Sequence, residues 1–314
     1  MNNLRYLTLL GFLSLIIALG CHPGEEQSAI KGTYSLMAGE SLLPLLERET
    51  ALFQQLYPEI KGSVVSSSTR EAIVALLNDS VSVIAVDRPL NAEEQRFAHQ
   101  TSRTVTLTDF AFDALAVLVH RDNPLPSLRV EHLQDILNRK VTRWDTPGRS
   151  GPGPSLRIVM TGPNSGVYEL LSRHFFTLNQ PLIPDKVVGS QREVFEALAL
   201  DPGAIGIVSH SFHVQARRDS TLARTVHDVR VVPLVTGTGD STNTSIPSQR
   251  SLYLKEYPLQ FTVSLATVER RVGPAAGFAT FITSVQGQKI VQEAGLLPVN
   301  IPIRLIELTQ ESIQ

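Results

Sequence analysis

A strand followed by a serine-bearing turn and then a helix is the pattern that most constrains how this chain can fold. It begins where the strand 34–37 leads through 38-AGES-41 into apolar residues at helical spacing. Ser41 is the predicted N-cap of that helix, and Pro44 falls within its first turn, where proline is tolerated. In open α/β sheets, ligands bind at the carboxyl ends of the strands, next to helix N-termini.

The same pattern recurs at once. Residues 62-GSVVSSS-68 predict a second strand that ends in a cluster of hydroxyl groups. Ser68 and Glu71 have the spacing of a capping box ahead of another apolar helix. The next strand, 81-VSVIAV-86, is almost entirely apolar, which is typical of a buried parallel sheet.

A second α/β block follows later in the chain. The strand 156–160 runs into 161-TGPNSGVYELL-171, where a turn places backbone N–H groups and a serine hydroxyl at the start of a helix. Such a place suits an anion, although these eleven residues include no basic side chain. Ser190 and Glu193 then cap a helix over 194–200, ahead of the strand 204–208.

Two apolar strands, at 113–124 and 257–266, are predicted to carry the chain between two lobes and back. We therefore expect lobe I to comprise residues 33–116 and 264–314, and lobe II residues 117–263. Two short helices over 273–295 would complete lobe I.

The first 21 residues are predicted to be a targeting segment. Their apolar run, 9–19, has the length of a signal h-region and is too short for a comfortable membrane span. The segment resembles a bacterial lipoprotein signal that ends at Cys21, which would be the lipidated first residue, although Ala18 stands where leucine is usual. The alternative is an ordinary secretory signal. Residues 22–32 are polar and turn-rich, as a tether should be.

Other classes of function are disfavoured. The formal net charge is −2 without a basic stripe, which argues against a nucleic-acid partner. No nucleophile–base pair is recognisable, and 164-NSG-166 has no neighbouring general base. His210 and His213 lie three apart, but with no adjacent carboxylate or cysteine we interpret them as part of a polar turn. We therefore predict a monomeric protein that is not an enzyme and needs no cofactor or metal.

Several segments, in this order, resemble the phosphate-binding proteins of ABC transporters. They include 87-DRPL-90, 109-DFAFDALAVLVHRDNP-124, 133-LQDILNRKVTRWD-145 and 284-SVQGQKIVQEAGLLPV-299, and the most specific are the stretch 133–145 and the Gly287-Gln288-Lys289 near the end. The resemblance covers nearly all of residues 33–300. It implies an α/β, type II periplasmic-binding-protein fold whose two lobes clamp an oxyanion for an ABC permease, with phosphate as the leading ligand.

The resemblance also implies a binding site made of hydroxyl and N–H groups at helix starts. Lobe I would supply Ser41, Leu42, Ser67, Ser68 and Thr69, and lobe II would supply Thr161, Asn164, Ser165, Gly166 and Val167. Val167 departs from the threonine of the family.

Two charged residues of the phosphate-specific members are replaced. Ser82 stands at the position that we align with their aspartate, and Thr161 stands in place of their arginine. Phosphate keeps an O–H near neutral pH, so a phosphate site needs a hydrogen-bond acceptor. Glu40 is our candidate for that acceptor; the alternatives are that it faces solvent or caps backbone N–H groups.

Arg88 and Arg70 are candidates for the missing cation, because an arginine fork fits a tetrahedral oxyanion. For Arg88 the alternative is a salt bridge with Asp87 or another hinge carboxylate, and for Arg70 it is a solvated residue of the first helical turn. A site without any cation would hold another oxyanion or small anion through neutral donors. A ligand-free scaffold or receptor lipoprotein is a further alternative.

Overall fold

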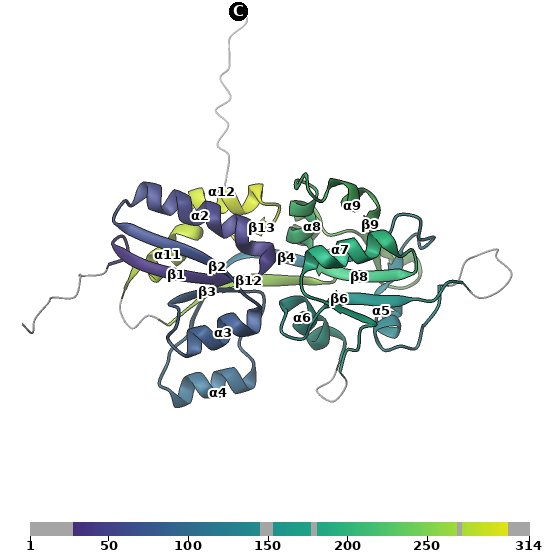
Figure 1. Ribbon diagram of the computed structural model, residues 1–314, viewed down its shortest axis with the longest axis horizontal. Helices are drawn as coiled ribbons and strands as arrows, with labels where there is room; N and C mark the ends of the chain where they lie inside the picture. Colours follow the sequence, from purple (N-terminus) through teal and green to yellow (C-terminus); the bar gives the residue numbers. More distant parts are fainter. Residues whose placement is uncertain (1–27, 145–152, 177–180, 269–271, 301–314) are drawn as a thin grey trace, which may run out of the picture.

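The computed structural model describes residues 28–144, 153–176, 181–268 and 272–300. The predictions for the targeting segment and Cys21 lie outside these residues. Two α/β lobes lie side by side, and each has helices on both faces of its sheet (Figure 1). Within the described residues, no helix is both long enough and apolar enough to cross a membrane.

Lobe I is built on three parallel strands in the order β2-β1-β3, and β3 is buried along its whole length, as its apolar sequence predicts. The predicted C-terminal helices are confirmed: α11 and α12 pack beside α2, where Phe53, Phe278 and Phe281 form an aromatic core. Helices α3 and α4 cover the other face (Figure 1). The elements are β1 (Gly32–Ala38), the 3-10 helix η1 (Glu40–Leu42), α2 (Leu43–Leu56), β2 (Ile60–Ser66), α3 (Thr69–Leu77), β3 (Val83–Val86), α4 (Ala92–Gln100), α11 (Pro274–Ile282) and α12 (Val285–Glu293).

Lobe II repeats the arrangement with parallel strands in the order β8-β6-β7. Trp144 packs in its core and donates a hydrogen bond from Nε1 to the carbonyl of Gly203. The main elements are α5 (Val130–Leu137), β6 (Arg157–Thr161), α6 (Gly166–Phe175), β7 (Lys186–Val188), α7 (Gln191–Leu200), β8 (Ala204–Ser209), α8 (His210–Ala216), α9 (Ala223–His227) and β9 (Val229–Val231). A small sheet is formed by β5 (Leu128–Arg129), β10 (Leu234–Thr236) and β11 (Asn243–Ser245), with η2 (Gly239–Ser241) and α10 (Gln249–Tyr253) nearby in sequence.

Two long antiparallel strands, β4 (Thr106–His120) and β12 (Gln260–Thr267), connect the lobes (Figure 1). Strand β12 also pairs with β3 of lobe I, whereas β4 also pairs with β8 of lobe II, and the short β13 (Leu297–Pro298) pairs with β4. The result is one continuous sheet through the molecule. We propose the lobe boundaries already given, since 116–117 and 263–264 both fall inside these strands.

The local predictions were mostly confirmed, with three corrections. Ser68 forms the predicted capping box with Glu71, and Ser190 caps α7. Ser41, however, is not an N-cap: it lies in η1, and α2 begins after Leu42 without a side-chain cap.

The other two corrections concern the segments around β4 and β8. The first crossing strand begins at Thr106, seven residues before the predicted start. The stretch 209–213 is not a polar turn, because His210 and His213 lie buried in α8. Burial lowers the pKa of each of these histidines to about 4.

Candidate functional site

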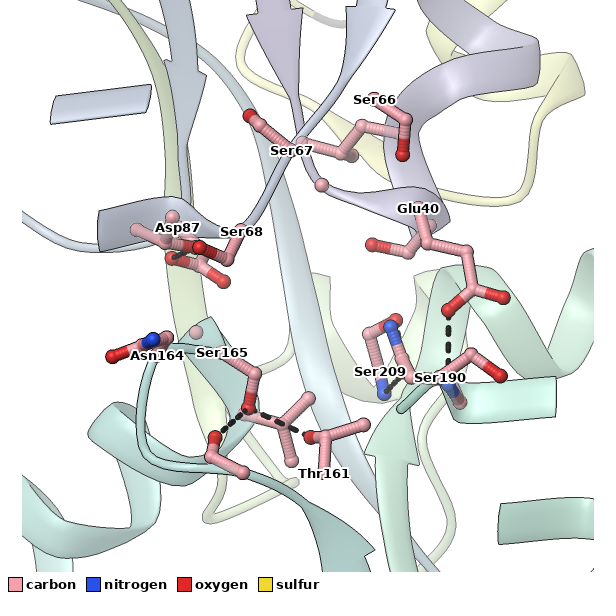
Figure 2. Close-up of a pocket in the computed structure, with 18 of the residues that line it drawn as sticks. Glu40, Ser66, Ser67, Ser68, Asp87, Thr161, Asn164, Ser165, Ser190 and Ser209 are labelled. Atoms are coloured by element: carbon pink, nitrogen blue, oxygen red, sulfur yellow. Dashed lines mark hydrogen bonds between the residues drawn. The ribbon is translucent and has the colours of Figure 1, made fainter. Parts of the chain in front are cut away.

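A cavity of about 670 Å³ lies between the lobes, at the carboxyl ends of strands from both sheets. Figure 2 shows Ser68 and Asp87 of lobe I facing Asn164 and Ser165 of lobe II. The structure brings together every predicted site residue except the two candidate arginines, Arg88 and Arg70: the lining includes Glu40, Ser41, Leu42, Ser67, Ser68, Thr69, Thr161, Asn164, Ser165, Gly166 and Val167.

The serines of lobe I differ in what their hydroxyl groups already bind. Ser68 Oγ accepts from the N–H of Glu71 and donates to the Glu71 carboxylate, so it is engaged in capping α3. Ser67 Oγ is shielded from solvent and has no hydrogen-bond partner among the described residues. A buried hydroxyl without a partner is costly, so the Ser67 hydroxyl is available to a ligand.

In lobe II, a short hydrogen-bonded chain fixes the turn ahead of α6. Ser165 Oγ caps the helix by accepting from the N–H of Tyr168, and it donates to the carbonyl of Gly162 at 2.9 Å. Thr161 Oγ1 lies 2.7 Å from Ser165 Oγ. Thr161 therefore supports the cap instead of supplying positive charge.

The cavity wall is acidic. Glu40, Glu71, Asp87 and Asp113 line it, whereas none of its lining residues, all of which the structure describes, is lysine, arginine or histidine. Ser82, at the position that we aligned with the family's aspartate, lies outside this cavity; the carboxylate beside the cavity comes from Asp87, which follows β3.

Of the carboxylates that line the cavity, Asp113 is buried and Asp87 is partly buried. Asp87 accepts a hydrogen bond from Thr69 Oγ1, and burial raises its pKa. Asp113, on β4, accepts from Ser211 Oγ at 2.5 Å and from the N–H of Ala114 at 2.8 Å. Burial raises the pKa of Asp113 to about 6 despite these hydrogen bonds, and the nearby Asp87 also raises it.

Glu40 connects the lobes. Its Oε2 accepts from the N–H of Gln191, the first residue of α7, at 2.9 Å, as the dashed line in Figure 2 shows. A carboxylate is stabilised at a helix N-terminus. Burial raises the Glu40 pKa, although hydrogen bonds from the Gln191 and Arg192 N–H groups act in the opposite direction. Glu40 thus lines the cavity and caps backbone N–H groups at the same time.

Neither candidate cation reaches the cavity. The buried Arg88 makes two hydrogen bonds to the Glu94 carboxylate, at 2.7 and 2.9 Å, and an ion pair with Glu169 of lobe II. Arg70, more than half exposed, also lies near Glu169, with Nε and Oε1 3.8 Å apart. The predicted alternative, in which Arg88 binds a carboxylate, describes this geometry; its partners are Glu94 and Glu169 instead of Asp87.

The comparison with known families decides the identity. The family described as a PBP superfamily domain matches residues 23–286. The chain belongs to the PBP superfamily. This membership confirms the predicted two-lobed type II periplasmic-binding-protein fold, and it confirms that this PBP superfamily protein is a binding protein and not an enzyme.

Individual relatives of this PBP superfamily protein are distant. The phosphate-binding protein PstS of Borreliella burgdorferi is 21% identical over 93% of this chain and 98% of its own length. SphX of Synechococcus elongatus is 25% identical over 63% of this chain, and the match spans only 60% of SphX.

Solved structures show the same fold at still lower identity. A Clostridium perfringens protein solved with bound phosphate has a TM-score of 0.69 at 18% identity, covering 86% of this chain and all of that one. An ABC-type phosphate transport receptor from Vibrio cholerae has a TM-score of 0.63 at 18% identity, covering 85% of this chain and all of that one. The OxyR2 regulatory domain of Vibrio vulnificus has a TM-score of 0.52 at 11% identity, and the match covers 86% of this chain and 100% of that domain. Because receptors and a regulatory domain share the fold, the function must be argued from the site.

Proposed function

We propose that this protein captures inorganic phosphate outside the cytoplasmic membrane and delivers it to an ABC permease. The observation that carries the proposal is the cavity between the lobes, where helix starts from both lobes meet and serine hydroxyls line the wall. The name of one relative, the phosphate-binding protein PstS of Borreliella burgdorferi, agrees with this ligand. We further propose a monomer anchored through a lipid on Cys21 at the periplasmic or cell surface.

The proposed mode of binding is a clamp made of neutral donors. Backbone N–H groups in the first turn of a helix lack intrahelical partners and carry the positive end of the helix dipole. In lobe I these donors come from the turns that contain Ser41 and Ser67–Thr69, and in lobe II from the turn around Ser165. Burial between the lobes excludes water and strengthens each contact.

Contacts between the lobes agree with a closed clamp around this cavity. Besides the bond from Gln191 to Glu40, the N–H of Arg70 donates to the carbonyl of Asn164 at 3.4 Å. Gln215 Nε2 of lobe II donates to the carbonyl of Ser41. These bonds join the loops that line the cavity.

The proposal is tested by calorimetric titration with phosphate, sulfate and molybdate, together with thermal unfolding in each anion. A ligand at a hundred times its dissociation constant should add about 2.7 kcal/mol to stability. We expect phosphate to do so. Binding of a different anion alone would favour the alternative of another oxyanion, and no shift with any anion would favour a ligand-free scaffold.

Ser67→Ala is expected to weaken phosphate binding by about tenfold, the loss that follows when one hydrogen bond to a charged ligand is removed. Because Ser67 Oγ has no partner among the described residues, the free energy of unfolding should change by less than about 0.5 kcal/mol. Calorimetry and urea denaturation measure the two quantities.

The matched control is Ser63→Ala, on the strand β2 that leads into Ser67, where the side chain is exposed and outside the cavity. We expect this variant to keep both affinity and stability. Equal phosphate affinity in the two variants would show that the Ser67 hydroxyl does not contact the ligand.

A further inference from the structure

The cavity wall carries negatively charged groups, whereas a site for a doubly charged anion needs positive charge. The wall carries four carboxylates, from Glu40, Glu71, Asp87 and Asp113, and no basic side chain. The nearest arginine candidates are turned to Glu94 and Glu169 instead.

We propose that the cavity takes phosphate in its singly charged form, H₂PO₄⁻, in preference to HPO₄²⁻. This inference rests on the proposed function and adds the protonation state that the site selects.

Charge is the first reason. The repulsion energy between two like charges is proportional to the product of the charges and decreases with distance and dielectric constant. A second negative charge on the phosphate therefore doubles its repulsion from every ionised carboxylate of the wall. Neutral hydroxyl and N–H donors stabilise an anion, but they do not cancel that added charge. A site with an arginine would cancel it, and here Thr161 is bonded to Ser165 at the helix start.

Hydrogen bonding is the second reason. H₂PO₄⁻ offers two O–H donors, and HPO₄²⁻ offers one. Asp87 and Asp113 both line the wall, and each has oxygens that accept hydrogen bonds. H₂PO₄⁻ therefore matches a wall whose lining residues offer carboxylate acceptors and include no cation.

The charged groups around these carboxylates come from several elements. Arg88 is adjacent to Asp87 in sequence and acts electrostatically on it, and Asp87 acts on Asp113. Around Glu40, Arg192 and Glu193 of α7 act in opposite directions. Among the described residues, the Glu71 carboxylate accepts hydrogen bonds only from the N–H and the hydroxyl of Ser68.

The wall and the ligand change charge in the same direction. Because burial raises the pKa of Asp113 to about 6, this group loses its proton as the pH rises from 5 toward 8, and burial raises the pKa of Asp87 in the same direction. Phosphate loses its second proton over the upper part of the same range. Both changes add negative charge, so affinity should be highest in mild acid and fall at alkaline pH.

The experiment is calorimetric titration of the full soluble chain with inorganic phosphate between pH 5.5 and 8.5, at constant ionic strength. We expect the dissociation constant to rise by about tenfold per pH unit once the pH exceeds the second pKa of phosphate, as binding of the monoanion alone requires. Thermal unfolding without ligand across the same range controls for the stability of the protein itself.

Sulfate is the matched second ligand, because it is tetrahedral and doubly charged at every pH in this range. We expect it to give no measurable binding heat. A phosphate affinity that is constant or increases with pH would overturn the inference and leave the proposed function standing. Sulfate binding with the same pH slope as phosphate would also overturn it, because the wall alone would then set the dependence. Absence of phosphate binding at every pH would overturn both.

Discussion

Gly166→Ala is expected to weaken phosphate binding by between about five- and 150-fold, with little loss of stability in either lobe. Gly166 is the first residue of α6 in lobe II, and it packs directly against a carboxylate of lobe I. A Cβ atom placed on Gly166 would lie 1.5 Å from Asp87 Oδ2. Forcing an extra methyl group into a packed contact costs about 1–3 kcal/mol.

The clash should weaken phosphate binding more than folding, because it is a contact between a residue of lobe I and a residue of lobe II. An arrangement with the lobes apart would escape the clash, whereas the arrangement that encloses the ligand would not. Calorimetry with phosphate measures the loss, and urea denaturation measures the stability.

Gly39→Ala is the control for this substitution. Gly39 also lines the cavity, but a Cβ atom there would have no neighbour within 4 Å, and its φ of −65° suits alanine. We expect this variant to bind phosphate normally. If Gly166→Ala did so as well, the two lobes would not approach each other at this contact during binding.

Arg88→Ala is expected to lower the free energy of unfolding by about 3–5 kcal/mol, the loss that follows when one partner of a buried ion pair is removed. The Arg88 side chain is 1% exposed, and those of its partners Glu94 and Glu169 are 13% and 15% exposed. Without the guanidinium, two largely buried carboxylates would lose their cation. The midpoint of urea denaturation measures the effect.

Arg48→Ala provides the comparison, because the Arg48–Glu293 pair is about half exposed on both sides. An exposed pair contributes only about 0–1 kcal/mol. A loss below about 1 kcal/mol in Arg88→Ala would contradict the assigned role. Phosphate affinity in Arg88→Lys tests the ligand role considered from the sequence: a lower melting temperature with unchanged affinity would identify Arg88 as a structural residue.

The sequence predicted the elements well because the signals that set them are local. Apolar runs such as Val83–Val86 indicate buried strands, and the caps at Ser68 and Ser190 depend on residues three positions away. Ser41 was predicted wrongly as a cap because a 3-10 turn precedes α2, and the sequence pattern does not distinguish the two.

The acidic wall was harder to predict, because it depends on which way side chains point. Asp87 and Arg88 follow the end of β3 in a bend, where the sequence pattern does not indicate which of two neighbouring side chains faces the cavity. The sequence analysis considered Arg88 for the cavity, whereas the structure places Asp87 there. Asp113 lies inside a long apolar strand, where nothing nearby in sequence marks it as part of the wall.

In the proposed transport role, the hydrogen bond from Gln191 to Glu40 has a consequence for how a transporter would recognise this protein. It is made entirely by groups of the chain itself, and it joins the two lobes beside the cavity. The outline that a permease would meet in that role is therefore supported in part by the protein's own Glu40 carboxylate and does not by itself report a bound ligand. A transporter that sensed only this outline would spend ATP on empty receptors, so reliable uptake requires it to sense something that the cargo alone supplies.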